Sequence, residues 1–373
     1  MRTVYWFLLF VIWLPFSANA INVALPNGIV KFTLKSPDSL GTTAAQQSLA
    51  IGGFSGLRFL KSTTDGKLLF LTHTDRGPNT ESFKKNGVVI RPFMLPKFTP
   101  RLVVLEANLT TKTMTIVRQI KLKDFAGKLL TGLPRQKSQE NPVNLYGQPL
   151  AFDKLGMDLE GIDIAGDGGY WMVDEYGPSI IHFSSQGKLV DWFQPGKGLP
   201  ELIKKRKLNR GFEGIALHGQ TAFAILQSPI SNEKVLPIIE FDIKKRQTTK
   251  VYFYKPDEQS ARIGDMVALD TYHFLVIEQT KKNKKIFLIN LLNTNKNKIV
   301  SKQLIVNLHN LGVKEDKIEG ITLVGLNHIA IITDNDFALT GTLIQKTGKA
   351  TFKKEYSTLY LIPLPAVLKN KLN

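Results

Sequence analysis

The sequence predicts an all-β protein folded as a single β-propeller. Short apolar segments alternate with Gly- or Asp-containing turns along most of the chain, which is typical of β-hairpins. One hairpin pattern recurs: a carboxylate, a short apolar strand, a turn and a second apolar strand. The copies are spaced by about fifty residues, and a repeat of that length built only from strands is typical of propeller blades.

The repeat is clearest in four copies, which begin at Glu160, Glu213, Asp265 and Glu319. These leading carboxylates are separated by 53, 52 and 54 positions. A weaker copy begins at Ser55, 105 positions before Glu160, which is about two such steps. Five blades are therefore visible and the chain has room for another. The sequence predicts five to six four-stranded blades, with six preferred.

The segments around the repeats fit the same plan. Residues 28–34 form a strand before the first repeat, and we expect this N-terminal strand to close the last blade. Residues 76–100 contain several prolines and indicate a long insertion over one face. Residues 127–157 are polar with Gly and Pro, which leaves two interpretations open, a second face loop or a poorly recognisable blade. Apart from a weak pattern over 196–207, no window of eleven or more residues has a helical period.

Composition sets further bounds. The chain has 373 residues, of which 43% are hydrophobic, and we expect one domain over residues 21–373. It contains no cysteine, which excludes disulfides, thiolate metal sites and thiol catalysis. The formal net charge of +18 favours anionic partners. Basic clusters such as 204–207 and 281–285 lie between strands and indicate solvated loops, and without an RNA-binding motif we expect no nucleic-acid partner.

Residues 1–20 have the pattern of a bacterial Sec-type signal peptide. Arg2 gives a short positive region, residues 5–16 are apolar, and small residues precede a cleavage site after Ala20. An uncleaved anchor is the alternative, but the apolar run is short for a membrane span. We therefore expect an exported protein, periplasmic or secreted, with no transmembrane span after cleavage. We expect it to be a monomer.

Carboxylates begin the first strand of most repeats, and in a propeller these first strands line the central channel. The leading carboxylates should ring one mouth of the channel, where like charges repel unless a cation lies among them. Oxygen ligands without His or Cys favour Ca²⁺ or Mg²⁺ over zinc. We predict a divalent cation, preferably Ca²⁺; capping of backbone N–H groups or pairing with Arg is the alternative. The predicted ligands are Glu160, Glu213, Asp265, Glu319, Asp334 and Asp336.

Arginines and further carboxylates accompany this ring. Arg210 and Arg262 each stand three residues before a leading carboxylate, and Arg76 follows Asp75 at the end of the first hairpin. Arg suits two-pronged binding of carboxylate or phosphate, so these side chains form internal ion pairs or bind an anionic substrate. The carboxylates would orient or deprotonate water. The predicted catalytic residues are Asp75, Arg76, Asp174, Glu175, Arg210 and Arg262.

Motifs of other hydrolytic mechanisms are absent. The chain has no Gly-x-Ser-x-Gly elbow, no His-Glu-x-x-His, no P-loop and no Arg-His-Gly of histidine acid phosphatases. The six histidines are scattered, and only His73 lies near the polar end of a repeat, where a core or surface role fits it best. For a hydrolase, the remaining residues favour metal-activated water.

Seven short motifs occur in order along the chain, at Asp75–Asn79, Asp158–Ile162, Asp174–Pro178, Asn209–Gly214, Gln227–Pro229, Ile263–Asp265 and Asp334–Asp336. With these motifs the chain resembles the bacterial family called esterase-like activity of phytase, or phytase-like domain, over about residues 45–365. The resemblance implies an exported β-propeller, loosely related to the calcium-dependent β-propeller phytases. It also implies esterase or phosphoesterase activity, and it assigns no role to individual residues.

Three functions follow from the sequence as hypotheses. The first is an exported hydrolase of phosphate or carboxylic esters, with a divalent cation at the channel mouth and a small anionic ester as substrate. The second is a non-catalytic binding or scaffold propeller of the cell envelope, with residues 76–100 as the partner surface. The third is a lactonase that uses the same carboxylates. Metal-dependent turnover would separate the first hypothesis from the second.

Overall fold

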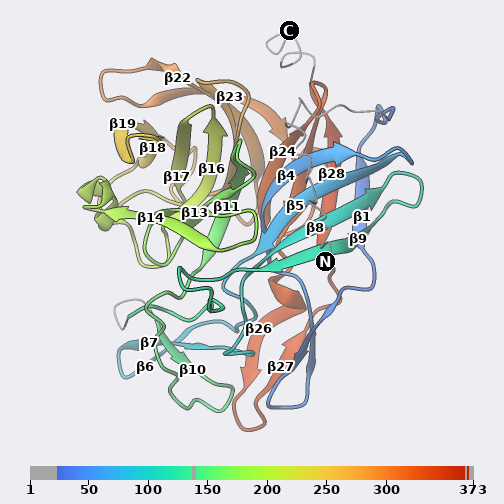
Figure 1. Cartoon of the computed structure of the whole chain (residues 1–373), viewed down its shortest axis with the longest axis vertical. Helices are drawn as coiled ribbons and strands as arrows, with labels where there is room; N and C mark the ends of the chain where they lie inside the picture. The colour runs from blue at the N-terminus through green and yellow to red at the C-terminus, as the bar shows by residue number, and fades with distance from the viewer. Residues whose placement is uncertain (1–22, 137–139, 366–367, 369–373) are drawn as a thin grey trace, which may run out of the picture.

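The computed structural model describes residues 23–136, 140–365 and 368, which form an almost purely β structure (Figure 1). Helical turns include the short 3₁₀ segments η1 (Glu201–Lys205), η2 (His309–Leu311) and η3 (Asp336–Ala338). The all-β prediction is therefore confirmed. The predicted signal peptide lies outside the described residues. Among the residues that are described, no helix is long and apolar enough to cross a membrane.

Three sheets follow one another along the middle of the chain, with strand orders β11-β12-β13-β14-β15, β16-β17-β18-β19 and β20-β21-β22-β23. Their pairings are antiparallel, except that β15 pairs in parallel with β14. In each sheet, consecutive strands are neighbours, which is the order of a propeller blade. Their strands are β11 (Leu159–Ile164), β12 (Tyr170–Asp174), β13 (Ser179–Phe183), β14 (Leu189–Pro195), β15 (Gly198–Leu199), β16 (Phe212–His218), β17 (Thr221–Leu226), β18 (Leu236–Asp242), β19 (Gln247–Tyr254), β20 (Arg262–Ala268), β21 (His273–Gln279), β22 (Lys284–Thr294) and β23 (Val300–Asn307).

An eight-stranded sheet, in the order β24-β25-β28-β1-β9-β8-β5-β4, contains two more units of this kind. They meet through a short parallel pairing of β1 with β9. The N-terminal strand β1 also pairs antiparallel with β28, so it is the outermost strand of its unit. The strands are β1 (Val30–Leu34), β4 (Phe54–Ser62), β5 (Lys67–Thr74), β8 (Arg101–Asn108), β9 (Thr113–Lys121), β24 (Ile318–Val324), β25 (His328–Thr333) and β28 (Thr358–Pro363).

The first strands of these units form a ring. β4, β11, β16, β20 and β24 each contact the next strand in this order, and β24 contacts β4. Glycines allow the close approach: a Cβ on Gly161 would lie 2.7 Å from the backbone N of Ile215, and one on Gly214 would lie 2.7 Å from the N of Met266. A side chain would separate the strands there, which explains the recurring Glu-Gly pair.

Residues 127–157, for which two interpretations were open, form a face insertion. Apart from residues 137–139, which lie outside the described residues, they comprise turns and strand β10 (Asn141–Val143), which pairs in parallel with β7 (Val88–Pro92). With β6 (Phe83–Lys85) these strands make a small sheet on the predicted insertion 76–100. The described part of the chain thus contains five four-stranded units of the ring, and the preference for six has no support there.

Several insertions gather at one end of the ring, below it in Figure 1. They comprise the β6-β7-β10 sheet, the hairpin of β26 (Leu339–Ile344) with β27 (Lys349–Phe352), and the hairpin of β2 (Ser39–Thr42) with β3 (Ser48–Ala50). They share a small core that includes Leu49, Met94, Phe98 and Phe337. Two of the insertions continue directly from the ends of β5 and β25. They therefore form a wall beside this end of the ring, which we call the mouth of the channel.

Candidate functional site

Structurally equivalent positions line this mouth of the channel. In every unit, a residue near the start of the inner strand pairs with a residue near the end of the second strand, next to a β-bulge. The residues that follow the inner-strand partner form an inner set, consisting of Ser55, Glu160, Glu213, Gly264 and Glu319. The residues that follow the second-strand partner form an outer set, consisting of Asp75, Glu175, Gln227, Gln279 and Asp334. Six carboxylates therefore lie at one mouth, and they include three of the four leading carboxylates of the repeat.

Asp265 does not belong to the inner set. The sequence aligned it with the leading glutamates, but Gly264 occupies their position and Asp265 lies one residue further along β20. The carboxylate of Asp265 accepts a hydrogen bond from the N–H of Ile321 at 3.0 Å and lies 3.5 Å from Nη1 of Arg58. In this repeat the glycine precedes the carboxylate instead of following it, which shifts the pattern by one position.

A buried arginine closes the channel beneath the carboxylates. Arg58, on β4, donates hydrogen bonds to the carbonyl oxygens of Ile321 at 3.0 Å and Met266 at 3.2 Å, and also to that of Ile215. Its Nε lies 3.0 Å from Asp163. The side chain therefore contacts all four of the other inner strands. The sequence gives little sign of its role, because Arg58 lies in the weakest copy of the repeat, where one charged residue interrupts an apolar strand.

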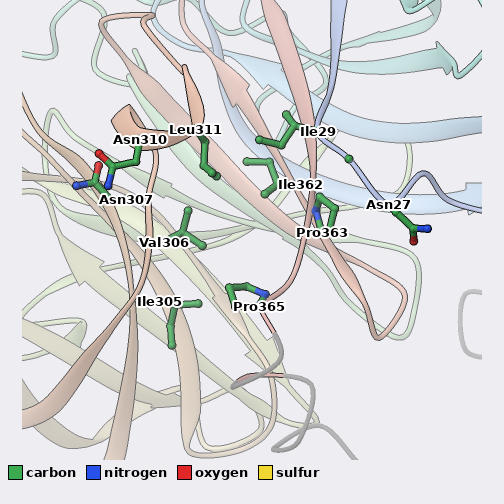
Figure 2. A pocket seen from close by; sticks show the side chains of 11 residues that line it. Asn27, Ile29, Ile305, Val306, Asn307, Asn310, Leu311, Ile362, Pro363 and Pro365 are labelled. Carbon is green, nitrogen blue, oxygen red and sulfur yellow. The ribbon is translucent and has the colours of Figure 1, made fainter.

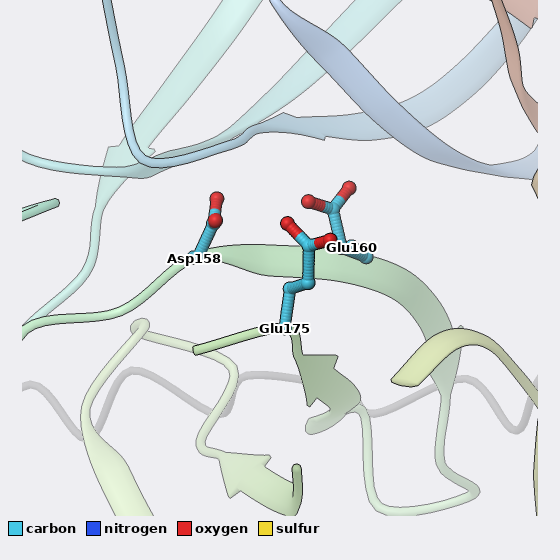
Figure 3. A group of neighbouring side chains, drawn as sticks. All are labelled: Asp158, Glu160 and Glu175. Atoms are coloured by element: carbon cyan, nitrogen blue, oxygen red, sulfur yellow. The ribbon is translucent and has the colours of Figure 1, made fainter. Parts of the chain in front are cut away.

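Three buried carboxylates at the mouth lie close enough to share one cation. Asp158 directly precedes β11, Glu160 lies within that strand, and Glu175 directly follows β12. One ligand oxygen from each lies within 4.8 Å of the others. Figure 3 shows the three carboxylates pointing into the same space. Asp158 was not among the predicted ligands, although its spacing of two from Glu160 places both side chains on one face of the strand.

Each of these carboxylates is held by a neighbour. The hydroxyl of Ser55 donates to Oε2 of Glu160 at 2.8 Å. Nη1 of Arg76 lies 3.1 Å from Oδ2 of Asp158, and Nη1 of Arg210 lies 3.3 Å from Oε1 of Glu175 (residues 175 and 210 lie in adjacent units). Two arginines thus face three carboxylates, and the glutamates of the inner set add further negative charge.

Burial and mutual repulsion raise the pKa values of the mouth carboxyls. Burial, followed by Glu213 and Asp158, raises the pKa of Glu160 well above its usual range. Burial, followed by Glu175 and Glu319, does the same to the pKa of Glu213. Burial and Asp158 raise the pKa of Glu175 to about 7. This excess of buried negative charge, carried only by hard oxygen donors, fits a divalent cation such as Ca²⁺.

We expect the metal-free protein to be more stable at about pH 5.5 than at about pH 8. The folded protein holds these carboxyls at raised pKa values, so it binds more protons than the unfolded chain and loses stability as the pH rises through those values. For Glu175 this window runs from its ordinary 4.5 to about 7. The expected loss is a few kcal/mol. Calorimetric melting in chelator at several pH values measures it, and a melting temperature that rises with pH would contradict the expectation.

The arginines of the mouth differ in their availability. Arg262 is exposed at the start of β20, and within the described residues its side chain has no hydrogen bond or ion pair. Partial desolvation beside the neighbouring side chains, followed by the nearby charge of Arg210, lowers its pKa. Arg76 instead has internal partners: it lies 3.5 Å from Glu140, beside Asp158, and over the ring of Tyr176. Arg262 is therefore suited to an incoming anion, whereas Arg76 is an internal partner.

Asp174 also has an internal role. Its Oδ1 accepts hydrogen bonds from the backbone N–H groups of Tyr176 at 2.9 Å and Asp158 at 3.3 Å, and its Oδ2 pairs with Arg135. It therefore fixes the turn that carries Glu175.

Asp75, which belongs to the outer set and was also predicted to be catalytic, has a different environment. Burial, followed by Asp334 and Asp158, raises its pKa, and no ion pair with Asp75 is found among the described residues.

The predicted ligands Asp334 and Asp336 share one lysine. Nζ of Lys317 lies 2.9 Å from Oδ2 of Asp334 and also contacts Asp336. Burial acts to raise the pKa of Asp334, but Lys317 more than offsets it and holds this pKa below its usual value.

His73 is buried against the carbonyl oxygens of Thr74 and Glu160, and burial lowers its pKa to about 4. It is a neutral core residue.

An apolar hollow of about 410 Å³ lies away from these groups, between β23 and the segments that precede β1 and follow β28 (Figure 2). It is lined by residues such as Ile29, Ile305, Leu311, Ile362 and Pro365, and none of its lining side chains titrates. It offers no titratable acid or base, whereas the carboxylates gather at the mouth of the channel, which is therefore the candidate site.

Sequence comparisons give two findings. A model of the family described as phytase-like, with esterase-like activity of phytase, matches residues 49–337. An uncharacterized secreted protein of Arthroderma benhamiae is 28% identical over 209 residues, which cover 42% of this chain and 41% of that protein. The chain therefore matches less than half of the length of this relative.

Solved structures give weaker likenesses. A luciferin-regenerating enzyme has 7% identity and a TM-score of 0.40, covering 88% of this chain and 96% of its own. A calcium-binding regucalcin of Agrobacterium tumefaciens has 12% identity and a TM-score of 0.39, covering 78% and 92%. A streptogramin B lyase has 11% identity and a TM-score of 0.35, covering 90% and 97%. Likenesses at this level say nothing about the chemistry of the site.

Proposed function

We propose an exported hydrolase of phosphate or carboxylic esters for this chain, which belongs to the phytase-like family described as esterase-like activity of phytase. The observation that carries the proposal is the group of three buried carboxylates at the channel mouth, whose oxygens lie within 4.8 Å of one another. Such a group is unfavourable unless a cation compensates it. Together with a free arginine beside it, the group is suited to an anionic ester.

Asp158, Glu160 and Glu175 would hold the divalent cation, with Glu213 and Glu319 as the next nearest carboxylates of the inner set. Ca²⁺ is the preferred ion because it accepts six to eight oxygen ligands at flexible geometry. When bound, the ion would supply Lewis-acid polarisation of the ester and a lower pKa for water. The remaining predicted ligands, Asp265, Asp334 and Asp336, are less suited to this role because they lie outside the group of three carboxylates and pair with Arg58 and Lys317.

Protein side chains would divide the other tasks. Arg262, with Arg210 behind it, would bind the anionic group of the substrate and orient its ester bond toward the carboxylates. Asp75 would orient the attacking water and accept its proton, because its raised pKa makes it a stronger base than an ordinary aspartate. Arg76 and Asp174 would fix the carboxylates in place.

The wider architecture fits this proposal. We read the five units as the blades of a five-bladed propeller, with β1 closing the last blade. Residues 1–20 would direct export and be removed, which leaves one periplasmic or secreted domain over residues 21–373 that acts as a monomer. The name of the relative as a secreted protein supports export.

Calorimetric titration of the metal-stripped mature protein with Ca²⁺ tests the proposal, followed by assays with a phosphate monoester, a carboxylic ester and a lactone. Tight binding together with Ca²⁺-dependent ester turnover is the expected result. Binding without turnover of any substrate would contradict the hydrolase and favour a binding propeller. Turnover of the lactone alone would replace the ester hydrolase by a lactonase.

Replacing Arg262 by Gln should raise the KM for an anionic ester by about tenfold or more and change kcat little. One exposed cation that binds substrate and transition state equally contributes to KM alone. Arg118→Gln is the matched control, because Arg118 is an exposed arginine on the outer strand β9. Steady-state kinetics measure both, and an equal loss in the two variants would show that Arg262 acts only through net charge.

A further inference from the structure

A basic pocket lies behind the turn that carries Glu175. It measures about 560 Å³, and Gly177 and Pro178 of that turn form part of its lining. The lining also includes four basic side chains and an indole ring but no carboxylate; these residues are Arg135, Lys154, Lys204, Arg206 and Trp192. Lys204 and Arg206 belong to a basic cluster that the sequence analysis interpreted as a solvated loop.

Positive charge in this pocket is only partly compensated. Arg135 pairs with Asp174 behind the wall of the pocket, and Lys204 lies 2.6 Å from the exposed Glu201. Lys154 and Arg206 have no ion pair within the described residues. Burial, with a contribution from the neighbouring Arg206, lowers the pKa of Arg135 to about 9. Each of the four cations would be stabilised further by an anion among them.

We propose that this basic pocket is a second anion-binding site, which takes a phosphate- or sulfate-type oxyanion group. Guanidinium groups match the geometry of such an oxyanion, and lysines add charge without a fixed direction. The pocket is much larger than a bare oxyanion and lies within the range of small-molecule sites. The ring of Trp192, with the guanidinium of Arg135 stacked 4.5 Å from its centroid, offers a flat face for the body of the ligand.

The pocket contacts the candidate active site through one short segment. Arg135 donates to the carbonyl oxygen of Gly177 at 3.3 Å, and Arg206 donates to that of Tyr176. These carbonyls directly follow Glu175. An anion held by the two arginines is therefore separated from the cation ligands only by residues 174–178. The oxyanion is either a second charged group of the substrate or a separate ion, and binding at this site is independent of whether the mouth hydrolyses esters.

Sulfate titration of the metal-free full-length mature protein tests the site, with a double Lys154→Gln and Lys204→Gln variant. Both lysines are exposed, so folding should be unaffected. The control is Lys205→Gln with Lys207→Gln, which removes the same charge from exposed positions outside the pocket lining. We expect sulfate affinity to fall at least about tenfold in the first variant and less than about twofold in the control. Tryptophan fluorescence, to which Trp192 of the pocket lining contributes beside the buried Trp171, provides a further readout.

Three results would overturn the proposal. The first is no sulfate binding to the unaltered protein at about 10 mM, and the second is an equal fall of sulfate affinity in both double variants. The third is loss of sulfate binding in Arg262→Gln alone, which would assign the ion to the channel mouth. The source of the oxyanion follows from kinetics. If the pocket variant raises the KM of a bisphosphate ester but not of a monophosphate ester, the ligand is a substrate group. If it changes neither KM while sulfate binding is lost, the ligand is a separate anion.

Discussion

Replacing Glu160 by Gln is expected to abolish both cation binding and ester hydrolysis. Glu160 is buried, one of its oxygens is occupied by the hydroxyl of Ser55, and its carboxylate faces those of Asp158 and Glu175. The amide lacks the charge and turns one ligand atom into a donor. Cation affinity should fall at least about 100-fold and kcat/KM at least about 1,000-fold. Calcium titration and steady-state kinetics measure the two effects.

A stability measurement separates this effect from misfolding. Because Glu160→Gln removes one of several repelling charges, the metal-free variant should melt at a higher temperature than the unaltered protein at about pH 8. Glu240→Gln serves as the control, since Glu240 lies on the outer strand β18 and its partners are Tyr252, Thr249 and Lys250. Hydrolysis that survives in Glu160→Gln would refute the proposed cation site.

Replacing Arg58 by Met is expected to destabilise the fold by about 3–5 kcal/mol. Burial acts to lower the pKa of Arg58, but Asp163 and Asp265 more than offset it, so the arginine is charged and paired. Methionine keeps much of the volume but leaves both carboxylates and the carbonyl oxygens of three strands without their donor. Equilibrium unfolding in urea, with chelator present, measures the loss.

Two further variants show where that loss arises. Adding Asp265→Asn to Arg58→Met should recover at least about 1 kcal/mol, because it removes a carboxylate left without its cation. Arg246→Met should cost less than about 1 kcal/mol, since Arg246 is 58% exposed in its pair with Asp191. A loss below about 1 kcal/mol for Arg58→Met itself would show that the inner strands do not depend on this side chain.

The sequence predicts the strand architecture well because each unit repeats the same local signals. An apolar inner strand, a turn and a second apolar strand are visible without any knowledge of their partners. The number of units was harder to predict. Residues 127–157 have turns and polar residues like the loops between strands, and only the pairing of β10 with β7 shows that they extend the insertion instead of forming a blade.

The candidate site is predicted in part. Glu160, Glu213 and Glu319 lie at equivalent positions because the Glu-Gly pair marks the place where neighbouring inner strands approach. The same pattern misplaced Asp265 by one residue. The partners of Asp174 and Asp158 could not be predicted, because Arg135 and Arg76 reach them from insertions whose course depends on tertiary packing. A single sequence does not show which carboxylate charges are neutralised by side chains from distant segments of the chain.

The position of Arg58 has a kinetic consequence. Because this side chain spans the ring beneath the carboxylates and contacts all four other inner strands, it fills the ring axis there, and we infer a site with one entrance. Under the proposed function, an incoming ester and a departing acid would use that entrance in turn. A released phosphate or carboxylate would leave past Arg262, the arginine proposed to bind the next substrate molecule. We therefore expect turnover to slow as product accumulates, because product competes with substrate at the same site.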